Sequence, residues 1–174
     1  MPIMMIFAVV VIALIVTAGL YEGMQISGAG NISNVATQIG ALARNVQDLY
    51  SMVPDYSSLT PAAVCQANAF PPQMGGCGPN NAAAAVYGSV DVVPAASIGS
   101  SLGNAGFAVR LGAQTSHLNT ASCIQLLTTV SAWGVSGTPG TLTTNNGVVS
   151  PTSAESWCRS IAGGQIDFIF AKNQ

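Results

Sequence analysis

The first 53 residues form one long apolar segment that changes character halfway along. Residues Pro2–Tyr21 carry no charged side chain. As a helix, such a segment would extend about 30 Å, the usual thickness of the hydrocarbon core of a bilayer. A helix is the structure expected in lipid, because it satisfies its backbone hydrogen bonds internally. We therefore expect residues 1–25 to be a protruding apolar helix that can lie in a membrane.

The residues that flank this segment indicate whether it is a signal peptide, a processed N-terminus or a membrane anchor. A secretory signal peptide needs a basic stretch before its apolar core, whereas the first basic residue of this chain is Arg44. An apolar start of this kind favours a protein whose basic leader was removed ahead of Met1. An ordinary single-pass membrane anchor is the alternative interpretation.

Residues 26–53 continue as an amphipathic helix pattern. Their apolar side chains recur mostly at steps of three and four, which predicts one buried helical stripe: Ile26, Ile32, Val35, Ile39, Leu42, Val46, Leu49 and Val53. Pro54 predicts that the helix ends at Val53, because the residue before a proline disfavours the α region. Glycine lowers helix stability by about 1 kcal/mol relative to alanine, so a weak zone is expected at four positions: Gly19, Gly23, Gly28 and Gly30.

Composition limits the functions open to the rest of the chain. Residues 54–174 suffice for one modest domain with its own core. Charged residues are only 6% of the chain, and its net charge is −2. With so few basic side chains, phosphate contacts to a nucleic acid are excluded as a main function. An uncharged polar surface is instead suited to close packing of like subunits.

The four cysteines predict disulfides. Cys65, Cys77, Cys123 and Cys158 make an even set outside the apolar segment, and four cysteines allow three connectivities. The short, Pro- and Gly-rich interval from Cys65 to Cys77 is typical of a stapled loop, and Cys123 and Cys158 would then close a larger region. Without a C-x-x-C pair, a metal site is not expected.

No sequence pattern supports catalysis. His117 stands without a partner motif, and neither a nucleophile elbow nor a phosphate-binding loop is present. We expect no enzyme activity and no cofactor.

The pattern after Pro54 predicts mixed α and β structure. Two sites combine a helix cap with proline at the first helical position, Thr60-Pro61 and Ser150-Pro151. A further helix is predicted over 120–133, followed by a loop over 136–146. Strands are predicted over 85–93, 107–111 and 166–170, the last of them inside a sheet. Trp133 and Trp157 are predicted to be core residues.

These elements carry a family resemblance across nearly the whole chain. It depends on the order and spacing of short segments: the apolar N-terminus, Asp48-Leu49-Tyr50, Tyr56-Ser57-Ser58-Leu59-Thr60, Asn68-Ala69-Phe70-Pro71, Met74, Cys123-Ile124-Gln125-Leu126, Cys158 and Ile166–Phe170. The chain resembles a mature type IVb pilin and is most similar to the major pilin of conjugative thin pili.

The resemblance implies an α+β ladle fold. In it, the apolar half of a long N-terminal helix protrudes and the amphipathic half packs on an antiparallel sheet. It also implies a Cys123–Cys158 disulfide bounding a surface-exposed D-region, residues 123–158, and a methylated N-terminus at Met1. Apolar side chains of the protruding half would form the filament core: Ile3, Ile6, Phe7, Val10, Leu14 and Val16.

The resemblance also implies partners for each stage of pilus assembly. They are the inner membrane before assembly, a prepilin peptidase, the pilus assembly machinery, and then other copies in a helical homopolymer. A tip adhesin is a further candidate partner. The implied location is the inner membrane of a Gram-negative bacterium for the precursor and an extracellular filament afterwards.

One position departs from the family. This chain has Met5 where the family usually has a glutamate, which is thought to meet the N-terminal amine of a neighbouring subunit. The departure keeps a minor pilin open as an alternative. A type II secretion pseudopilin and a membrane-anchored binding domain are further alternatives, although the carboxylate cluster typical of major pseudopilins near the C-terminus is missing.

Overall fold

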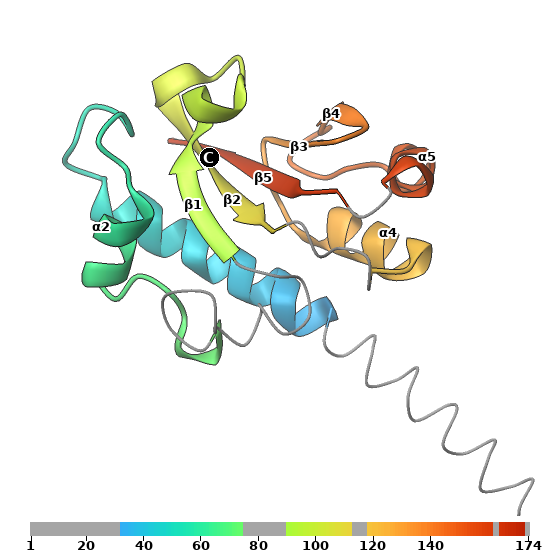
Figure 1. Cartoon of the computed structure of the whole chain (residues 1–174), viewed down its shortest axis with the longest axis horizontal. Coiled ribbons are helices and arrows are strands. Elements are labelled where there is room, and N and C mark those ends of the chain that lie inside the picture. The colour runs from blue at the N-terminus through green and yellow to red at the C-terminus, as the bar shows by residue number, and fades with distance from the viewer. Residues whose placement is uncertain (1–31, 75–89, 113–117, 162–163, 173–174) are drawn as a thin grey trace, which may run out of the picture.

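A helix at residues 32–49 lies along one face of a five-stranded antiparallel sheet, and two more helices lie near one end of that sheet (Figure 1). This computed structural model describes residues 32–74, 90–112, 118–161 and 164–172. The predicted protruding helix at 1–25, the predicted strand residues 85–89 and His117 lie outside the described residues.

After the 32–49 helix, the described chain forms short helices and strands. In chain order they are α2 (Pro61–Gln66), η1 (Pro72–Met74), β1 (Val90–Pro94), η2 (Ala95–Ile98), η3 (Gly103–Ala105), β2 (Gly106–Leu111), α4 (Thr120–Thr129), β3 (Gly134–Gly137), β4 (Gly140–Thr143), α5 (Pro151–Ser160) and β5 (Ile166–Ala171). The predicted α+β class with an antiparallel sheet is confirmed.

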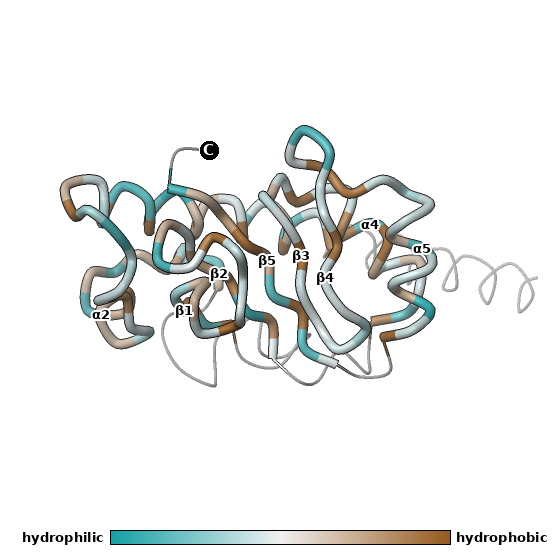
Figure 2. Tube along the Cα trace, turned by 90° about the horizontal axis from the view of Figure 1, so that it is seen from above, coloured by the Kyte–Doolittle hydropathy of each residue, from teal (hydrophilic) through white to brown (hydrophobic). Residues whose placement is uncertain are grey.

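The sheet has the strand order β1-β2-β5-β3-β4, so the strand that comes last in the sequence is central. Strand β5 pairs antiparallel with β2 on one side and with β3 on the other. Figure 2 looks onto the sheet from above and shows these strands side by side. The prediction that residues 166–170 form a strand inside a sheet is confirmed.

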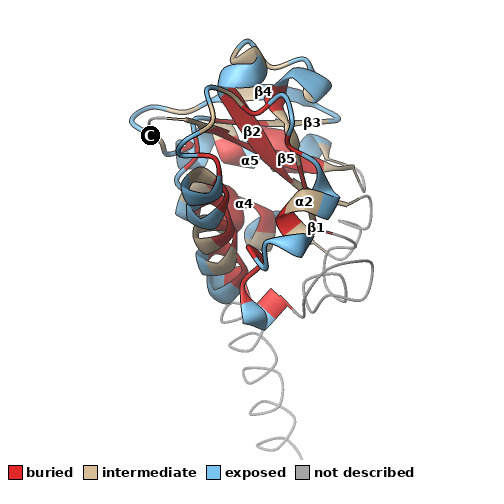
Figure 3. Cartoon of the chain, turned by 90° about the vertical axis from the view of Figure 1, so that its left-hand side faces the viewer, coloured by how far each residue is buried: buried red, intermediate tan, exposed pale blue. Residues whose placement is uncertain are grey.

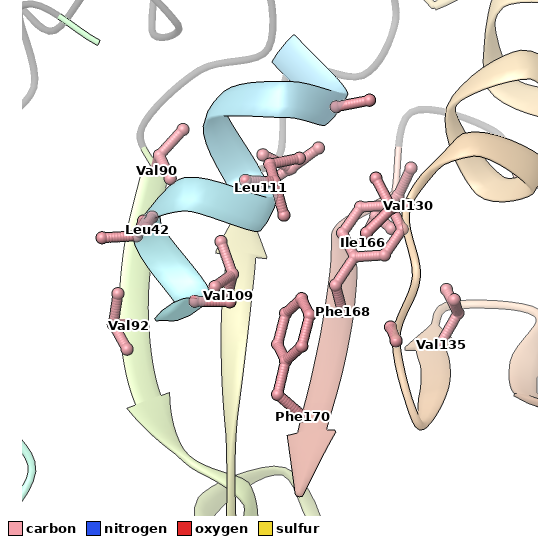
Figure 4. Close-up of a cluster of buried hydrophobic side chains, with 14 of the residues drawn as sticks. Leu42, Val90, Val92, Val109, Leu111, Val130, Val135, Ile166, Phe168 and Phe170 are labelled. Carbon is pink, nitrogen blue, oxygen red and sulfur yellow. The ribbon is translucent and has the colours of Figure 1, made fainter. Parts of the chain in front are cut away.

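The main core lies between the 32–49 helix and the sheet. The buried face of the helix turns toward the strands, and its other face is exposed (Figure 3). From the sheet side, Val92, Val109, Phe168 and Phe170 point into this layer, where Leu42 meets them (Figure 4). Since successive strand residues face opposite ways, the other face of the sheet is built from the alternate positions.

An aromatic series connects the end of the helix to the sheet. Tyr50 lies 5.4 Å from Tyr56, Tyr56 lies 4.9 Å from Phe107, and Phe107 lies 5.4 Å from Phe170, measured between ring centroids. Aromatic pairs at such distances add about 0.5–1.5 kcal/mol each beyond their buried area. The series therefore fixes the helix end against strands β2 and β5.

The helix ends earlier than predicted. Regular α-helix stops at residue 49, and hydrogen bonds from Ser51 N–H to the Asp48 carbonyl (3.2 Å) and from Val53 N–H to the Tyr50 carbonyl (3.1 Å) form tighter turns before Pro54. Leu49, the last residue of the regular helix, is 41% exposed, and the prediction that it lies in the buried stripe is wrong. Tyr50 is buried instead: its N–H donates to the Val46 carbonyl at 3.0 Å, so it lies one helical turn after Val46 on the buried stripe.

Both predicted helix caps are confirmed. The Thr60 hydroxyl accepts the Ala63 N–H at 3.2 Å, and Ser150 Oγ accepts the Ser153 N–H at 3.2 Å. Each cap is followed by proline at the first helical position. These local rules need no tertiary information.

Two predictions between residues 130 and 146 are wrong. Helix α4 ends at Thr129 rather than at Trp133, because Val130 becomes extended and the Trp133 N–H donates to the Ile169 carbonyl of β5 at 2.7 Å. Beyond it, part of the predicted 136–146 loop forms the β3–β4 hairpin, in which β3 pairs with β5. Pairing with the central strand thus overrides the local sequence pattern.

Candidate assembly surface

The D-region contains helices α4 and α5 with the β3–β4 hairpin between them. A disulfide joins Cys123 of α4 to Cys158 of α5, with 5.9 Å between their Cα atoms and 35 residues of separation. Both cysteines are buried, and this is the pairing that the resemblance implied. The disulfide therefore holds both ends of the region in one position.

Packing inside the D-region depends on one glycine. A Cβ on Gly137 would lie 2.6 Å from the Gln165 carbonyl oxygen and 2.7 Å from Cζ2 of Trp157. The indole of Trp157 is buried here and donates to the Gly140 carbonyl at 3.1 Å. The prediction that Trp157 is a core residue is confirmed. Its contacts with Gly137 and Gly140 pack the β3–β4 hairpin against α5.

Trp133 differs from its prediction. Its side chain is 37% exposed, and Val148 is 43% exposed. The two segments are linked by a hydrogen bond from the Ala132 N–H to the Gly147 carbonyl (2.9 Å). Trp133 is therefore a surface residue, because its backbone joins the sheet while its ring points away from the core.

A polar row crosses the outer face of the sheet. The register places Asp91, Arg110, Asp167, Ser136 and Thr141 opposite one another on successive strands. Asp167 is buried at the centre, where Oδ1 accepts the Arg110 Nε–H at 2.9 Å. Gln165 Nε2 also donates to both carboxylate oxygens, at 3.2 and 3.0 Å. The buried charge is thus paired and hydrogen-bonded, as a buried charge must be.

The other half of this outer face is apolar and covered. Ala95, Ala108 and Ile169 form a small second core, over which Ile98 and Leu102 of the 95–105 connection pack. The polar row is therefore the open half of the outer face.

A groove runs along the other side of the molecule, between the 32–49 helix and the end of α4. Its volume is about 430 Å³. It is lined by Ala36, Thr37, Gly40, Ala43, Arg44, Gln47, Thr129, Val130, Ser131 and Phe170. The helix is held beside β5 here, since Gln47 Nε2 donates to the Ala171 carbonyl at 3.0 Å.

Two titratable groups near the end of the helix have shifted pKa values. Burial raises the pKa of Tyr56, whose hydroxyl has no hydrogen-bond partner among the described residues. Hydrogen bonds from the side chain and backbone of Ser57 lower the pKa of Asp55. Neither group lies in a cluster that suggests chemistry.

Several predicted site residues lie outside the described residues. These are Met1, the filament-core set Ile3, Ile6, Phe7, Val10, Leu14 and Val16, the glycines Gly19, Gly23, Gly28 and Gly30, and Cys77. Cys65 is disulfide-bonded.

Two features are absent from the described ranges. No helix there is long and apolar enough to cross a membrane. No group of three or more His, Cys, Asp or Glu side chains in those ranges is placed to hold a metal ion.

The fold and surface define a class: an α+β head with a disulfide-closed D-region, as expected for a pilin-like structural subunit. A family model described as PilS N terminal matches residues 29–171, which is most of the chain. The chain therefore belongs to the PilS family, whose namesake is a type IV pilin of a conjugative pilus. Searches of curated proteins and of solved structures found no match. Pilins are structural proteins rather than enzymes.

Proposed function

We propose that this chain is the major subunit of a type IVb pilus that serves conjugation or cell attachment. The observation that supports this most directly is the family match over residues 29–171. The disulfide-closed D-region, whose one charged residue is Glu155, and the uncharged apolar sequence of residues 2–21 also agree with it. Because head-to-tail contacts do not close, such subunits form a helical polymer.

The proposed sequence of events begins in the inner membrane. Residues 1–25 hold the precursor there, a prepilin peptidase exposes and methylates the N-terminus, and the assembly machinery extracts the subunit. In the filament, the apolar side chains of this segment leave lipid and bury against equivalent helices. At about 25 cal/mol per Å² of buried apolar area, contacts with several neighbours make the filament cohesive. A tip adhesin would then account for recognition of other cells.

One observation favours a second candidate, a minor pilin. Met5 replaces the glutamate that the family usually has, so the ion pair with a neighbouring N-terminus is absent. A minor subunit would occur at low copy number, whereas a major subunit must account for most of the filament mass.

Electron microscopy of sheared surface filaments, with quantitative mass spectrometry of their composition, tests the proposal. The major-subunit proposal expects filaments composed mainly of this chain. A trace amount in filaments built from another pilin would support the minor pilin instead. A monodisperse monomer after detergent extraction, without filaments, would support a membrane-anchored binding domain and contradict both.

Removing residues 1–25 tests the two-part organisation. The expected product is a soluble, folded, disulfide-bonded monomer, because the main core of the head uses residues from 32 onward. An unfolded product would contradict this.

A further inference from the structure

The groove beside the 32–49 helix has an apolar floor and a polar rim. Ala36, Val130 and Phe170 are buried residues that contribute to its lining, and Thr37 and Arg44 are exposed at its edge. The exposure of Thr37 and Arg44 leaves the groove open to solvent. A surface element of another molecule can therefore enter it without disturbing the fold.

Gly40 in this groove is not explained by packing within the subunit. Glycine inside a helix costs about 1 kcal/mol relative to alanine. A Cβ at Gly40 would meet no atom within 4 Å, so alanine would fit and would stabilise the isolated head. The open space at Gly40 therefore allows the backbone of another molecule to approach the helix closely there.

Arg44 supplies an uncompensated charge at the same place. Its recorded hydrogen bond runs from Nε to the Gly40 carbonyl of the same helix, at 3.3 Å. The salt bridges among the described residues join Arg110 to Asp167 and Arg159 to Glu155, and none involves Arg44. A partner that enters the groove should therefore carry a carboxylate.

Few carboxylates of the chain are available to provide it. Asp167 and Glu155 are in ion pairs, and Asp55 accepts both hydrogen bonds of Ser57. Among the described residues this leaves Asp48 and Asp91. Asp48 lies one helical turn after Arg44 on the same helix, whereas Asp91 lies on edge strand β1.

Asp91 is also on a different face of the molecule from the groove. Its neighbours Val90 and Val92 are buried against the helix side, so Asp91 belongs to the outer face with the polar row. Two different surfaces that match each other in charge give a head-to-tail contact, which repeats into an open polymer instead of closing as a dimer.

We propose that the groove binds the β1 edge of a second copy of this chain, with Asp91 of that copy beside Arg44. The inference depends on the proposed function, since a filament supplies the second copy, and it names the contact between heads. Gly40 leaves room for the β1 edge of the second copy. The Arg44–Asp91 pair favours this edge over the other edge strand of the sheet, β4.

A charge-swap experiment on the full chain tests the pair. Filaments sheared from cells that express wild type, Arg44→Asp, Asp91→Arg or the double variant are quantified. Each single variant is expected to lose filaments by more than about tenfold, because each places like charges together at the contact. The double variant is expected to recover them. Thermal unfolding and a non-reducing gel check that every variant is folded and oxidised.

Matched controls separate this contact from a general effect of charge. Arg159→Asp makes the same charge change on α5, outside the groove, and should assemble normally. Gly40→Ala should raise the unfolding temperature of the head yet reduce filament yield, which a merely structural role would not do.

The outcomes distinguish the inference from the proposed function. If wild type forms no filaments, the proposed function fails and the inference with it. If wild type and Arg44→Asp assemble equally, or if both Arg44→Asp and Arg159→Asp abolish filaments, the function stands and the inference is overturned. Rescue of Arg44→Asp by Asp48→Arg instead of Asp91→Arg would overturn the assignment of Asp91.

Discussion

Replacing both Cys123 and Cys158 with alanine should lower the free energy of unfolding by about 4 kcal/mol. The bond joins residues 35 positions apart. For a closed loop of that length, the chain-entropy relation gives a loss of about 13 cal/mol/K in the unfolded state, or about 3.8 kcal/mol at 25 °C. Alanine is preferable to serine, because both side chains are buried and a hydroxyl there would need a partner.

The assay is equilibrium unfolding in urea of the full chain in mild detergent, followed by tryptophan fluorescence. Trp157 is suitable as the reporter, because it packs beside the hairpin that the disulfide encloses. Total stabilities of about 5–15 kcal/mol are usual, so the variant should stay folded without denaturant. A loss below about 1 kcal/mol would refute the reasoning, since the chain-entropy term would then not act in this protein.

Three further predictions concern the head. Gly137→Ala should destabilise it by about 1–3 kcal/mol in thermal unfolding, because the new Cβ would overlap Trp157 and the Gln165 carbonyl; an unchanged melting temperature would contradict the packing. Arg110→Met should lower the free energy of unfolding by about 3–5 kcal/mol, because it leaves the Asp167 carboxylate buried without its ion-pair partner. Adding Asp167→Leu should restore most of that free energy. A double variant as unstable as the single one would contradict this account. Tyr56→Phe should be neutral or stabilising, because the hydroxyl has no partner among the described residues. Since the pKa of Tyr56 is raised in the folded state, the stability of the wild type should hold below about pH 10 and fall above it. If the variant loses stability in alkali to the same extent, another group is responsible.

Local signals made part of the fold predictable. Residues adjacent in the sequence determine the helix caps at Thr60 and Ser150. They also determine the apolar alternation of the strands over 107–111 and 166–170. The β3–β4 hairpin was not predictable in this way. Its strands Gly134–Gly137 and Gly140–Thr143 are rich in glycine and threonine, and each has a single strongly apolar residue, Val135 or Leu142. Figure 2 shows brown segments among pale ones in this hairpin. They become strands because β3 pairs with β5, which comes much later in the chain, as in the pairing of Val135 with Phe168.

The candidate assembly surface was predictable only in outline. The apolar stripe of the 32–49 helix could be located from its period. The stripe identifies the side chains that the helix buries inside its own subunit, however, and not the surface that meets another subunit. The groove depends on where Val130 and Phe170 come to lie beside Ala36 and Gly40, which is a tertiary arrangement. The end of the helix at residue 49 was also not predictable from the apolar period, and Tyr50, which follows it, packs 5.4 Å from Tyr56 between ring centroids.

The central place of β5 has a consequence for when the head can fold. Strands β1 and β2 pair with each other, and so do β3 and β4, and among the described strands the two pairs are joined only through β5. Until residues 166–171 arrive, the chain can form two separate hairpins and no continuous sheet. Folding is therefore expected to be post-translational, with a late step in which the last strand enters between the hairpins and buries Phe168 and Phe170. On the proposed function, a subunit would thus remain unable to join a polymer until residues 166–171 had completed its sheet.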